Sequence, residues 1–242
     1  KLKSGKSSAF TCDFETAGEE ERGEWDGAYV IANKFEAAGE LVFGPRGSRI
    51  HVKAACDGKR FCFEYRVPDR TPWVNGSTDW RNMYAMGDTV DFQLSDPNGD
   101  LRVSVGGLAG ETVATLYKPV SKGEKAPHRF FSGVYREGVE WALVKKIPVE
   151  ASVVRGDREY LIAWSIALAD LGLDARTLDG LADRPRVAIA PLRGDFGVTF
   201  GDMAGKDTVQ RIFRFNHETG IVADEVEELK LQPQNWGELR RL

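Results

Sequence analysis

The loop that leads into residues 88–94 is the part of the sequence best suited to binding chemistry. It places three large aromatic residues, Trp73, Trp80 and Tyr84, among glycine, asparagine, serine and aspartate. Aromatic rings in a polar loop can hold flat or half-apolar ligands, and such loops often carry function on a rigid scaffold. The alternative interpretation is that these rings only cover the open end of a β-sandwich.

The sequence contains no pattern that predicts catalysis. Its three histidines, His51, His128 and His217, lie outside any nucleophile-elbow or zinc-protease motif. The glycines at 106, 107 and 110 fall between predicted strands with no helix after them, so a β-turn explains them better than a phosphate-binding loop. No carboxylate pair stands out for glycoside hydrolysis. We therefore predict that the protein is not an enzyme.

The cysteines predict neither a zinc site nor a disulfide framework. There are three, Cys12, Cys56 and Cys62, so at least one stays outside any disulfide within the chain. No Cys-x-x-Cys or Cys/His pair has the spacing of zinc ligands. Cys56 and Cys62 flank the turn at Asp57-Gly58; one strand register would bring them into contact, but the sequence does not specify it.

Short alternating segments run from about residue 41 to the end of the chain. From Thr89 to Leu94 apolar and polar residues alternate, the period-two pattern of a half-buried strand. Residues 118–138 are polar and lysine-rich and predict a long loop, while 169–173 predict a single helical turn that ends at Gly172. The other predicted strands are 9–14, 48–55, 60–67, 101–105, 112–117, 141–148, 151–154, 160–168, 186–190, 197–200 and 211–215.

Short strands with Gly, Pro and Asn turns, and no βαβ alternation, predict an all-β fold. We expect a single antiparallel β-sandwich domain, jelly-roll-like with long loops, over residues 10–242 after a flexible lead-in at 1–9. Its predicted core includes Phe61, Phe63, Val90, Phe92, Leu94, Val103 and Ile162.

Composition excludes several classes of partner. The net charge is −4 and no basic stripe is present, so nucleic acid is not an expected partner. Apolar residues make up 42% of the chain, enough for a sizeable core, yet no apolar run approaches the ~20 residues that span a bilayer. The chain opens without methionine and without a hydrophobic signal core, as expected of a mature or excised piece.

Several short motifs follow one another in a recognisable order along the chain. They are Gly23-Glu24-Trp25-Asp26, the hairpin Val52–Asp69, Trp80 followed by Gly87-Asp88-x-Val90-Asp91-x-x-Leu94, the strand and turn Tyr160–Leu173, and Pro233-x-x-Trp236-Gly237. Over residues 12–240 their order resembles that of family 9 carbohydrate-binding modules, part of the wider DOMON-like superfamily of β-sandwiches. Ala163 or Trp164 stands where that family has an acid, and Ala167 stands where it has a proline.

The resemblance implies a non-catalytic carbohydrate-binding domain of a larger secreted or cell-surface protein, in an extracytoplasmic compartment. Its partner would be an oligo- or polysaccharide, and it would be monomeric or attached to further domains. Tryptophan rings would stack on pyranose faces, while short polar groups and a planar arginine would bind hydroxyls. The expected ligand-binding residues are Trp73, Asn75, Asp79, Trp80, Arg81, Asn82 and Tyr84.

Two other functions and one cofactor remain open. Relatives in the superfamily bind haem, so Met83 or Met86 could ligate haem in an electron-transfer domain, with His51, His128 or a lysine as the second ligand. The alternative for the methionines is gap-filling in the core. The chain could also be a structural or interaction domain with a decayed site. Structural calcium is frequent in the family, no cofactor is certain, and the candidate calcium ligands are Asp13, Glu15 and Asp26.

Overall fold

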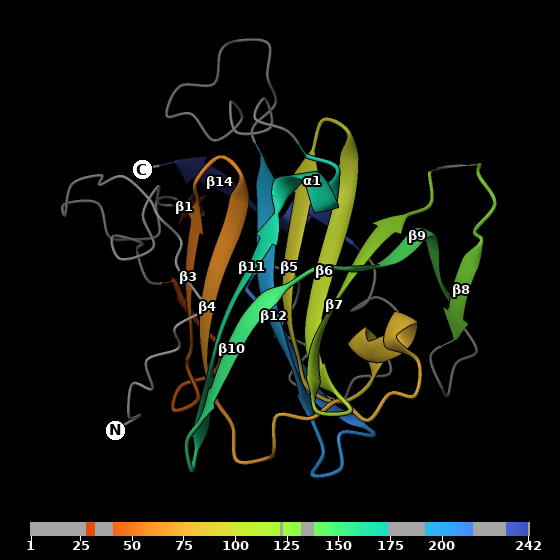
Figure 1. The fold of residues 1–242 in the computed structure, drawn as a ribbon. Coiled ribbons are helices and arrows are strands. Elements are labelled where there is room, and N and C mark those ends of the chain that lie inside the picture. The colour runs from red at the N-terminus through yellow and green to blue at the C-terminus, as the bar shows by residue number, and fades with distance from the viewer. Residues whose placement is uncertain are drawn as a thin grey trace. The chain divides into compact units, whose positions relative to one another are not determined.

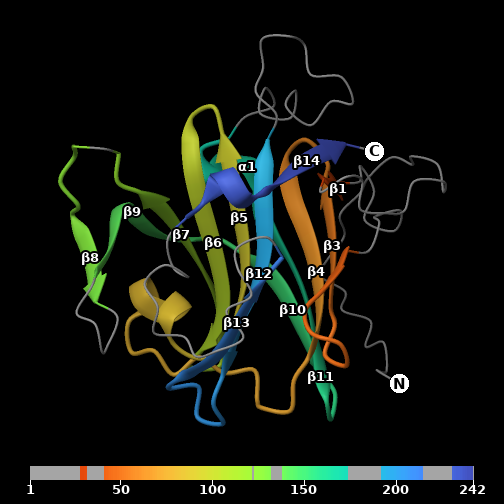
Figure 2. The same cartoon turned by 180° about the vertical axis from the view of Figure 1, so that it is seen from behind.

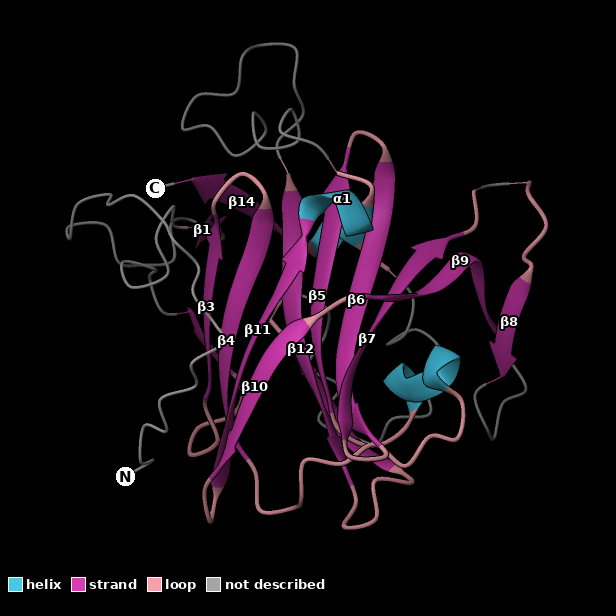
Figure 3. Cartoon of the chain, in the orientation of Figure 1, coloured by secondary structure: helices cyan, strands magenta, loops and turns pink. Residues whose placement is uncertain are grey.

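A computed structural model of the chain describes residues 28–31, 41–121, 123–131, 138–173, 192–214 and 231–241. Nearly all of their regular structure is β-strand, with only short helical segments (Figure 3). The described residues divide into two compact units. Unit 1 takes its residues from 1–70, 148–194 and 237–242, and unit 2 from 71–147 and 195–236.

Unit 1 is built on one antiparallel sheet whose central strand lies between two long partners. Its order is β10 (Glu150–Arg155), β11 (Glu159–Ala167), β4 (Arg60–Pro68), β3 (Ile50–Cys56) and β2 (Leu41–Phe43). Figure 1 shows β4 flanked by β3 and β11. Phe63 of β4 and Trp164 of β11 are opposite residues, and their rings lie 4.3 Å apart.

Unit 1 also contains a short helix and a strand pair. The helix α1 (Leu168–Leu171) follows β11 and ends at Gly172 with a φ of 75°, which is the left-handed cap predicted from the sequence. The strands β1 (Ala28–Ile31) and β14 (Gly237–Arg241) pair in parallel, and β14 pairs antiparallel with Arg193 and Gly194. The sequence did not predict β1 or β14.

Unit 2 is built on a longer antiparallel run of strands. Its order is β12 (Arg193–Gly201, of which 195–201 belong to this unit), β5 (Thr89–Asp96), β6 (Gly99–Leu108), β7 (Glu111–Pro119), β9 (Gly138–Ile147) and β8 (His128–Phe131), with β13 (Thr208–Phe213) paired to β12. The described part of unit 2 also contains the 3₁₀ helices η1 (Trp80–Ala85) and η3 (Pro233–Asn235). Figure 2 shows the strands from behind.

The predicted all-β class and apolar core are confirmed. The described chain has two antiparallel sheets, as in a β-sandwich, with a single parallel pair in β1–β14. In unit 2, the rings of Phe92 and Phe196 stack at 5.4 Å. All seven residues predicted for the core are fully buried: Phe61, Phe63, Val90, Phe92, Leu94, Val103 and Ile162.

Two expectations from the sequence are wrong in detail. Residues 118–138 are not one loop, because β8 lies within them and pairs with β9, a pairing that their polar composition did not indicate. β5 is not half-buried either, since the polar face formed by Thr89, Asp91 and Gln93 is as buried as the apolar one. The predicted strands 9–14 and 186–190 and the lead-in 1–9 lie outside the described residues, and the single domain stays a prediction.

Among the described residues, no helix has the length and apolar character needed to cross a membrane.

We expect Phe92→Ala to lower the free energy of unfolding by about 3–5 kcal/mol, because it removes a fully buried ring and leaves a cavity against Phe196. The measurement is chemical denaturation followed by intrinsic fluorescence. Val209→Ala is the matched control, since Val209 is 51% exposed. Equal effects of the two substitutions would contradict the assignment of Phe92 to the core.

Candidate functional site

The aromatic loop forms the 3₁₀ helix η1 over part of the segment predicted as loop. Asp79 caps its start in an extended conformation, and its side chain accepts a hydrogen bond from the backbone N–H of Arg81 at 3.0 Å. The backbone N–H of Asn82 donates to the backbone carbonyl oxygen of Asp79 at 2.9 Å. Four of the predicted site residues, Asp79 to Asn82, therefore form the cap and the first turn of one short helix.

Asn75 fixes η1 to the rest of unit 2. Its side-chain amide donates to the carbonyl oxygens of Met83 at 2.8 Å, Met86 and Asp88, so it bonds both η1 and the chain that leaves it. Its backbone N–H donates to Gly107 O at 2.8 Å. With 2% of its surface exposed, Asn75 uses its hydrogen-bonding groups to hold the loop. A contact of Asn75 with a ligand stays a prediction that nothing in this geometry favours.

Close backbone approaches hold the two ends of the loop. Gly87 has a φ of 63°, and a Cβ there would lie 2.6 Å from the carbonyl oxygen of Gly205. Gly205 has a φ of 66°, and a Cβ there would lie 2.6 Å from the carbonyl oxygen of Val74. The carboxylate of Asp88 accepts from Val74 N at 3.1 Å and from Gly201 N at 2.7 Å. Larger residues at these glycines would push η1 away from its position.

The structure does not bring Trp73 and Trp80 together. A Cβ on Gly107 would lie 2.8 Å from Nε1 of Trp73, so the Trp73 indole covers that face of β6. Trp80 instead packs against the buried cluster that contains Leu108, the next residue of β6. Because successive residues of a strand face opposite sides of the sheet, the two indoles lie on opposite faces of β6. They cannot sandwich one ligand ring in this arrangement.

Tyr84 lies inside a cluster of aromatic rings beneath η1. Its ring meets Tyr117 edge-on at 4.9 Å and Trp141 edge-on at 5.9 Å, and all three are buried. The hydroxyl of Tyr84 accepts a hydrogen bond from Trp141 Nε1 at 3.4 Å. Burial raises the pKa of Tyr84, and raises the pKa of Tyr117 further. Tyr84 therefore has no surface for stacking on a ligand, although the sequence predicted that role.

The exposed side of η1 carries a charged pair beside an indole. Nε and Nη2 of Arg81 donate to the carboxylate of Asp79, with Nη2–Oδ2 at 2.6 Å. The Asp79 and Arg81 side chains are 35% and 49% exposed. Hydrogen bonding from Arg81 lowers the pKa of Asp79, and the same bonds raise the pKa of Arg81, so both stay charged at neutral pH. Trp80, the residue between them in the sequence, is partly buried.

Trp80 and Met83 lie over the same patch of the sheet. In a 3₁₀ helix residues i and i+3 lie one above the other, and both side chains contact the cluster formed with Leu108 and Val113. The hydroxyl of Thr115 donates to the carbonyl of Trp80 at 3.2 Å. The inner edge of Trp80 is thus fixed by packing, which pre-organises its remaining surface.

The sheet under η1 carries a charged pair that sequence reasoning missed. Nε of Arg102 donates to Oδ1 of Asp91 at 3.0 Å, and neither side chain has any exposed surface. Gln93 is the residue opposite Arg102 in the β5–β6 register. The turn at Asp96–Gly99 fixes this register, so counting outward from that turn would have paired Gln93 with Arg102 from the sequence alone.

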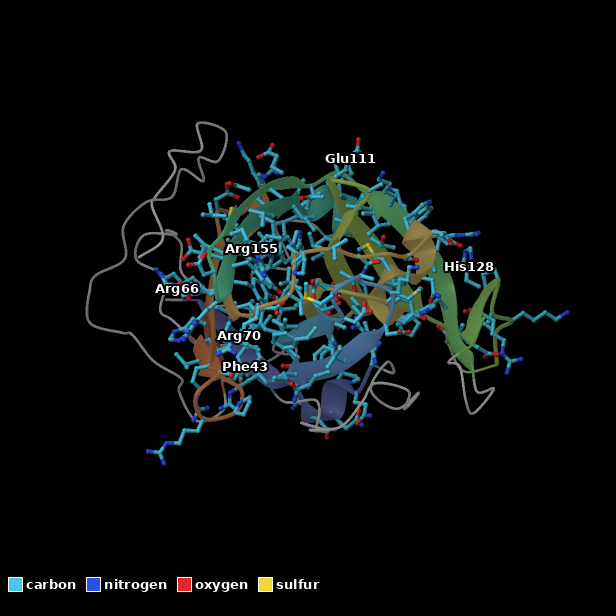
Figure 4. The ribbon with its side chains drawn as sticks, turned by 90° about the horizontal axis from the view of Figure 1, so that it is seen from below. Phe43, Arg66, Arg70, Glu111, His128 and Arg155 are labelled. Atoms are coloured by element: carbon cyan, nitrogen blue, oxygen red, sulfur yellow. The ribbon has the colours of Figure 1, made fainter. Side chains whose placement is uncertain are left out.

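The candidate haem ligands lie on several different elements. Met83 is buried beside Leu108 and Val113, and its sulfur lies 3.9 Å from the Thr115 hydroxyl, as expected for core packing. His128 lies on β8 (Figure 4) and His51 on β3. Within the described ranges, no group of three His, Cys, Asp or Glu residues could hold a metal ion. The candidate calcium ligands Asp13, Glu15 and Asp26 lie outside those ranges, so calcium stays a prediction.

The fold is similar to that of known carbohydrate-binding modules. A family 9 module from Caldicellulosiruptor kristjanssonii in complex with cellotriose matches with a TM-score of 0.50 and 11% identity, over 88% of this chain and 93% of that chain. A family 9 module from the same organism in complex with glucose gives a TM-score of 0.49 and 12% identity, over 89% and 95%. No family model and no curated protein sequence matches the chain.

At 11% identity, the match to the cellotriose complex shows the fold alone. It confirms the likeness to family 9 modules that the order of sequence motifs indicated. The wider DOMON-like assignment stays a prediction, as do the haem-binding and interaction-domain alternatives.

We expect Asn75→Ala to lower the free energy of unfolding by about 1–3 kcal/mol, because the carbonyl oxygens of Met83, Met86 and Asp88 each lose a hydrogen bond in a buried or partly buried place. Amide hydrogen exchange should rise first in residues 80–88. Asn98→Ala is the control, because the Asn98 side chain bonds only Asp96 in an exposed turn. Unchanged exchange in residues 80–88 would show that Asn75 does not hold η1.

Proposed function

We propose that the chain is a non-catalytic saccharide-binding domain whose binding surface is the start of η1. The observation that carries the proposal is the set of consecutive residues Asp79, Trp80, Arg81 and Asn82, here called the η1 platform. It joins a partly exposed indole to a charged pair held in fixed geometry.

The chemistry of the η1 platform suits a sugar ring. An indole face packs on the C–H face of a pyranose, and burial of that contact is favourable. Asp79 binds Nε and Nη2 of Arg81, which leaves Nη1 to donate to a hydroxyl. Oδ1 of Asn82 has no hydrogen-bond donor among the described residues, but it is buried, so a ligand hydroxyl could donate to it only after the surrounding side chains move. The similarity of the fold to that of a module solved with cellotriose supports this proposal.

Trp73, Asn75 and Tyr84 have other roles in this proposal. Trp73 covers the opposite face of β6, Asn75 holds η1 to the sheet, and Tyr84 packs beneath it. The binding site is therefore smaller than the loop, and stacking depends on one indole.

We expect Trp80→Ala to weaken saccharide binding about tenfold, the equivalent of about 1–2 kcal/mol for one aromatic contact and its buried area. A glycan array identifies the ligand, and calorimetry on that ligand measures affinity well below the unfolding transition, because Trp80 also contributes to packing.

Trp73→Ala is the matched control, since it removes the same ring from the other face of β6. We expect it to leave the affinity unchanged. Equal losses from both substitutions would contradict the η1 platform, and an array with no bound saccharide would contradict the function itself.

We also propose that the domain works outside the cytoplasm, as part of a larger secreted or cell-surface protein. Cys62 is in a disulfide bond, and disulfides persist mainly in oxidising compartments. Cys56 is buried and keeps its thiol, so Cys56 and Cys62 do not pair with each other.

One disulfide uses two of the three cysteines, so we expect one thiol to react with a chromogenic disulfide reagent in denaturant without reductant. None should react in the folded protein, because Cys56 is buried, and all three should react after reduction. Protein purified from an oxidising compartment is the sample. Three reactive thiols before reduction would count against the disulfide and against this location.

A further inference from the structure

Two neighbouring side chains on the buried polar face of the unit 2 sheet have hydrogen-bonding atoms without partners. They are Gln93 of β5 and Arg102 of β6, opposite residues in the antiparallel register. Both are completely buried. Neither the oxygen nor the nitrogen of the Gln93 amide has a partner among the described residues, and Nη1 and Nη2 of Arg102 have none either.

The contacts of Arg102 leave one edge of its guanidinium unused. Asp91 binds it through Nε alone. The rings of Tyr84 and Phe213 lie 5.5 and 5.3 Å from its central carbon. Those rings favour the cation but offer no hydrogen-bond acceptor in return. Leaving buried polar atoms unpaired is costly, so such groups in a folded protein call for an explanation.

Deepening the proposed function, on which this inference rests, we propose that Gln93 and Arg102 together bind two hydroxyls on neighbouring carbons of one saccharide ring. We call the two residues the Gln93–Arg102 fork. The two guanidinium nitrogens donate to the hydroxyl oxygens. One hydroxyl donates in turn to Oε1 of Gln93, and Nε2 of Gln93 donates to the other.

The hydrogen-bond donors and acceptors of the Gln93–Arg102 fork favour a neutral sugar over an acidic one. A hydroxyl both donates and accepts, so a hydroxyl pair can satisfy the fork's donors and its single acceptor. A carboxylate only accepts, and would leave Oε1 of Gln93 buried without a donor. The charge of Arg102 is already opposed by Asp91 at 3.0 Å, which lessens the gain from a second anion. The geometry therefore points to a neutral saccharide.

The fork lies next to η1, which must shift for a sugar to enter. The ring of Tyr84 covers Arg102, and the carbonyl of Tyr84 accepts from Nη2 of Arg211 at 3.3 Å. The bond from Thr115 to Trp80 measures 3.2 Å, and the bond from Trp141 to Tyr84 measures 3.4 Å. These three hydrogen bonds lie at or beyond the long end of the usual range, so the stronger restraint on this side of η1 is the bond from Asn75 to Met83 O at 2.8 Å.

The test is Gln93→Met, a substitution of similar size that removes both polar atoms of the side chain. Because the amide is unpaired in the ligand-free protein, we expect the melting temperature to stay the same or rise. We expect affinity for the saccharide found on the glycan array to fall on the order of tenfold. Gln210→Met on β13 is the matched control, since Gln210 is only half-buried.

The outcomes separate this inference from the proposed function. A clear fall in the melting temperature of Gln93→Met relative to Gln210→Met would mean that the amide is paired in the folded protein, by protein or by trapped water, and would overturn the inference. Wild-type affinity in both Gln93→Met and folded Arg102→Lys, with a loss in Trp80→Ala, would overturn it while the proposed function stands. Tighter binding of a uronic acid than of its neutral counterpart would overturn the hydroxyl assignment. A protein that binds no saccharide would overturn both.

Discussion

The polar face of the sheet in unit 2 is organised around the buried ion pair between Asp91 and Arg102. Two charges removed from water are stable only when they pair closely and their other polar atoms find partners. Asp91 meets this requirement, because Arg102, Ser104 and Thr89 all donate to its carboxylate. Arg102 meets it only through Nε. The pair therefore links β5 to β6 in the register that the turn at Asp96–Gly99 sets, and leaves Nη1 and Nη2 of Arg102 without acceptors among the described residues.

A second constraint is the path of the loop around the end of β6. Trp73 precedes the crossing and lies on one face, while η1 follows it and lies on the other. The crossing requires close backbone contact, which Gly87 and Gly205 allow at positive φ. Asn75 then bonds carbonyl oxygens in η1 and after it. A loop that reads as one polar, aromatic stretch thus divides into a structural half and a half that can face a ligand.

Sequence reasoning predicted the class of fold and the apolar core because both follow from alternation and turn residues. Val90 and Phe92 occupy the buried side that their spacing indicates. Alternation also separates the polar side of β5, but it cannot tell whether that side meets water or protein, so the burial of Asp91 and Gln93 was missed. β8 was missed because the polar, lysine-rich composition around it gives no strand alternation, although its partner β9 is the next strand in the chain.

The candidate site shows the same limit of sequence reasoning. Residue type predicted that the segment forming η1 binds saccharide, which stays a prediction, and Asp79 and Arg81 do lie exposed on it. Residue type could not show that Tyr84 points inward, or that Trp73 and Trp80 lie on opposite faces, because both depend on which side of β6 the chain passes. Only the packing of Trp73 against Gly107 and of Trp80 near Leu108 decides this.

Because of these constraints, η1 connects the exposed platform to the buried polar face of the sheet. Trp80 and Tyr84 belong to one short helix, so a ligand that repositions Trp80 also moves the ring that covers Arg102. Coupling between two contacts is reciprocal, so hydroxyls bound at Arg102 would in turn favour the position of η1 that admits them. Asn75 limits how far η1 can travel, since it bonds the carbonyls of Met83 and Met86 at the end of the helix. The start of η1, where the platform lies, is held by the packing of Trp80 and by the 3.2 Å bond from Thr115.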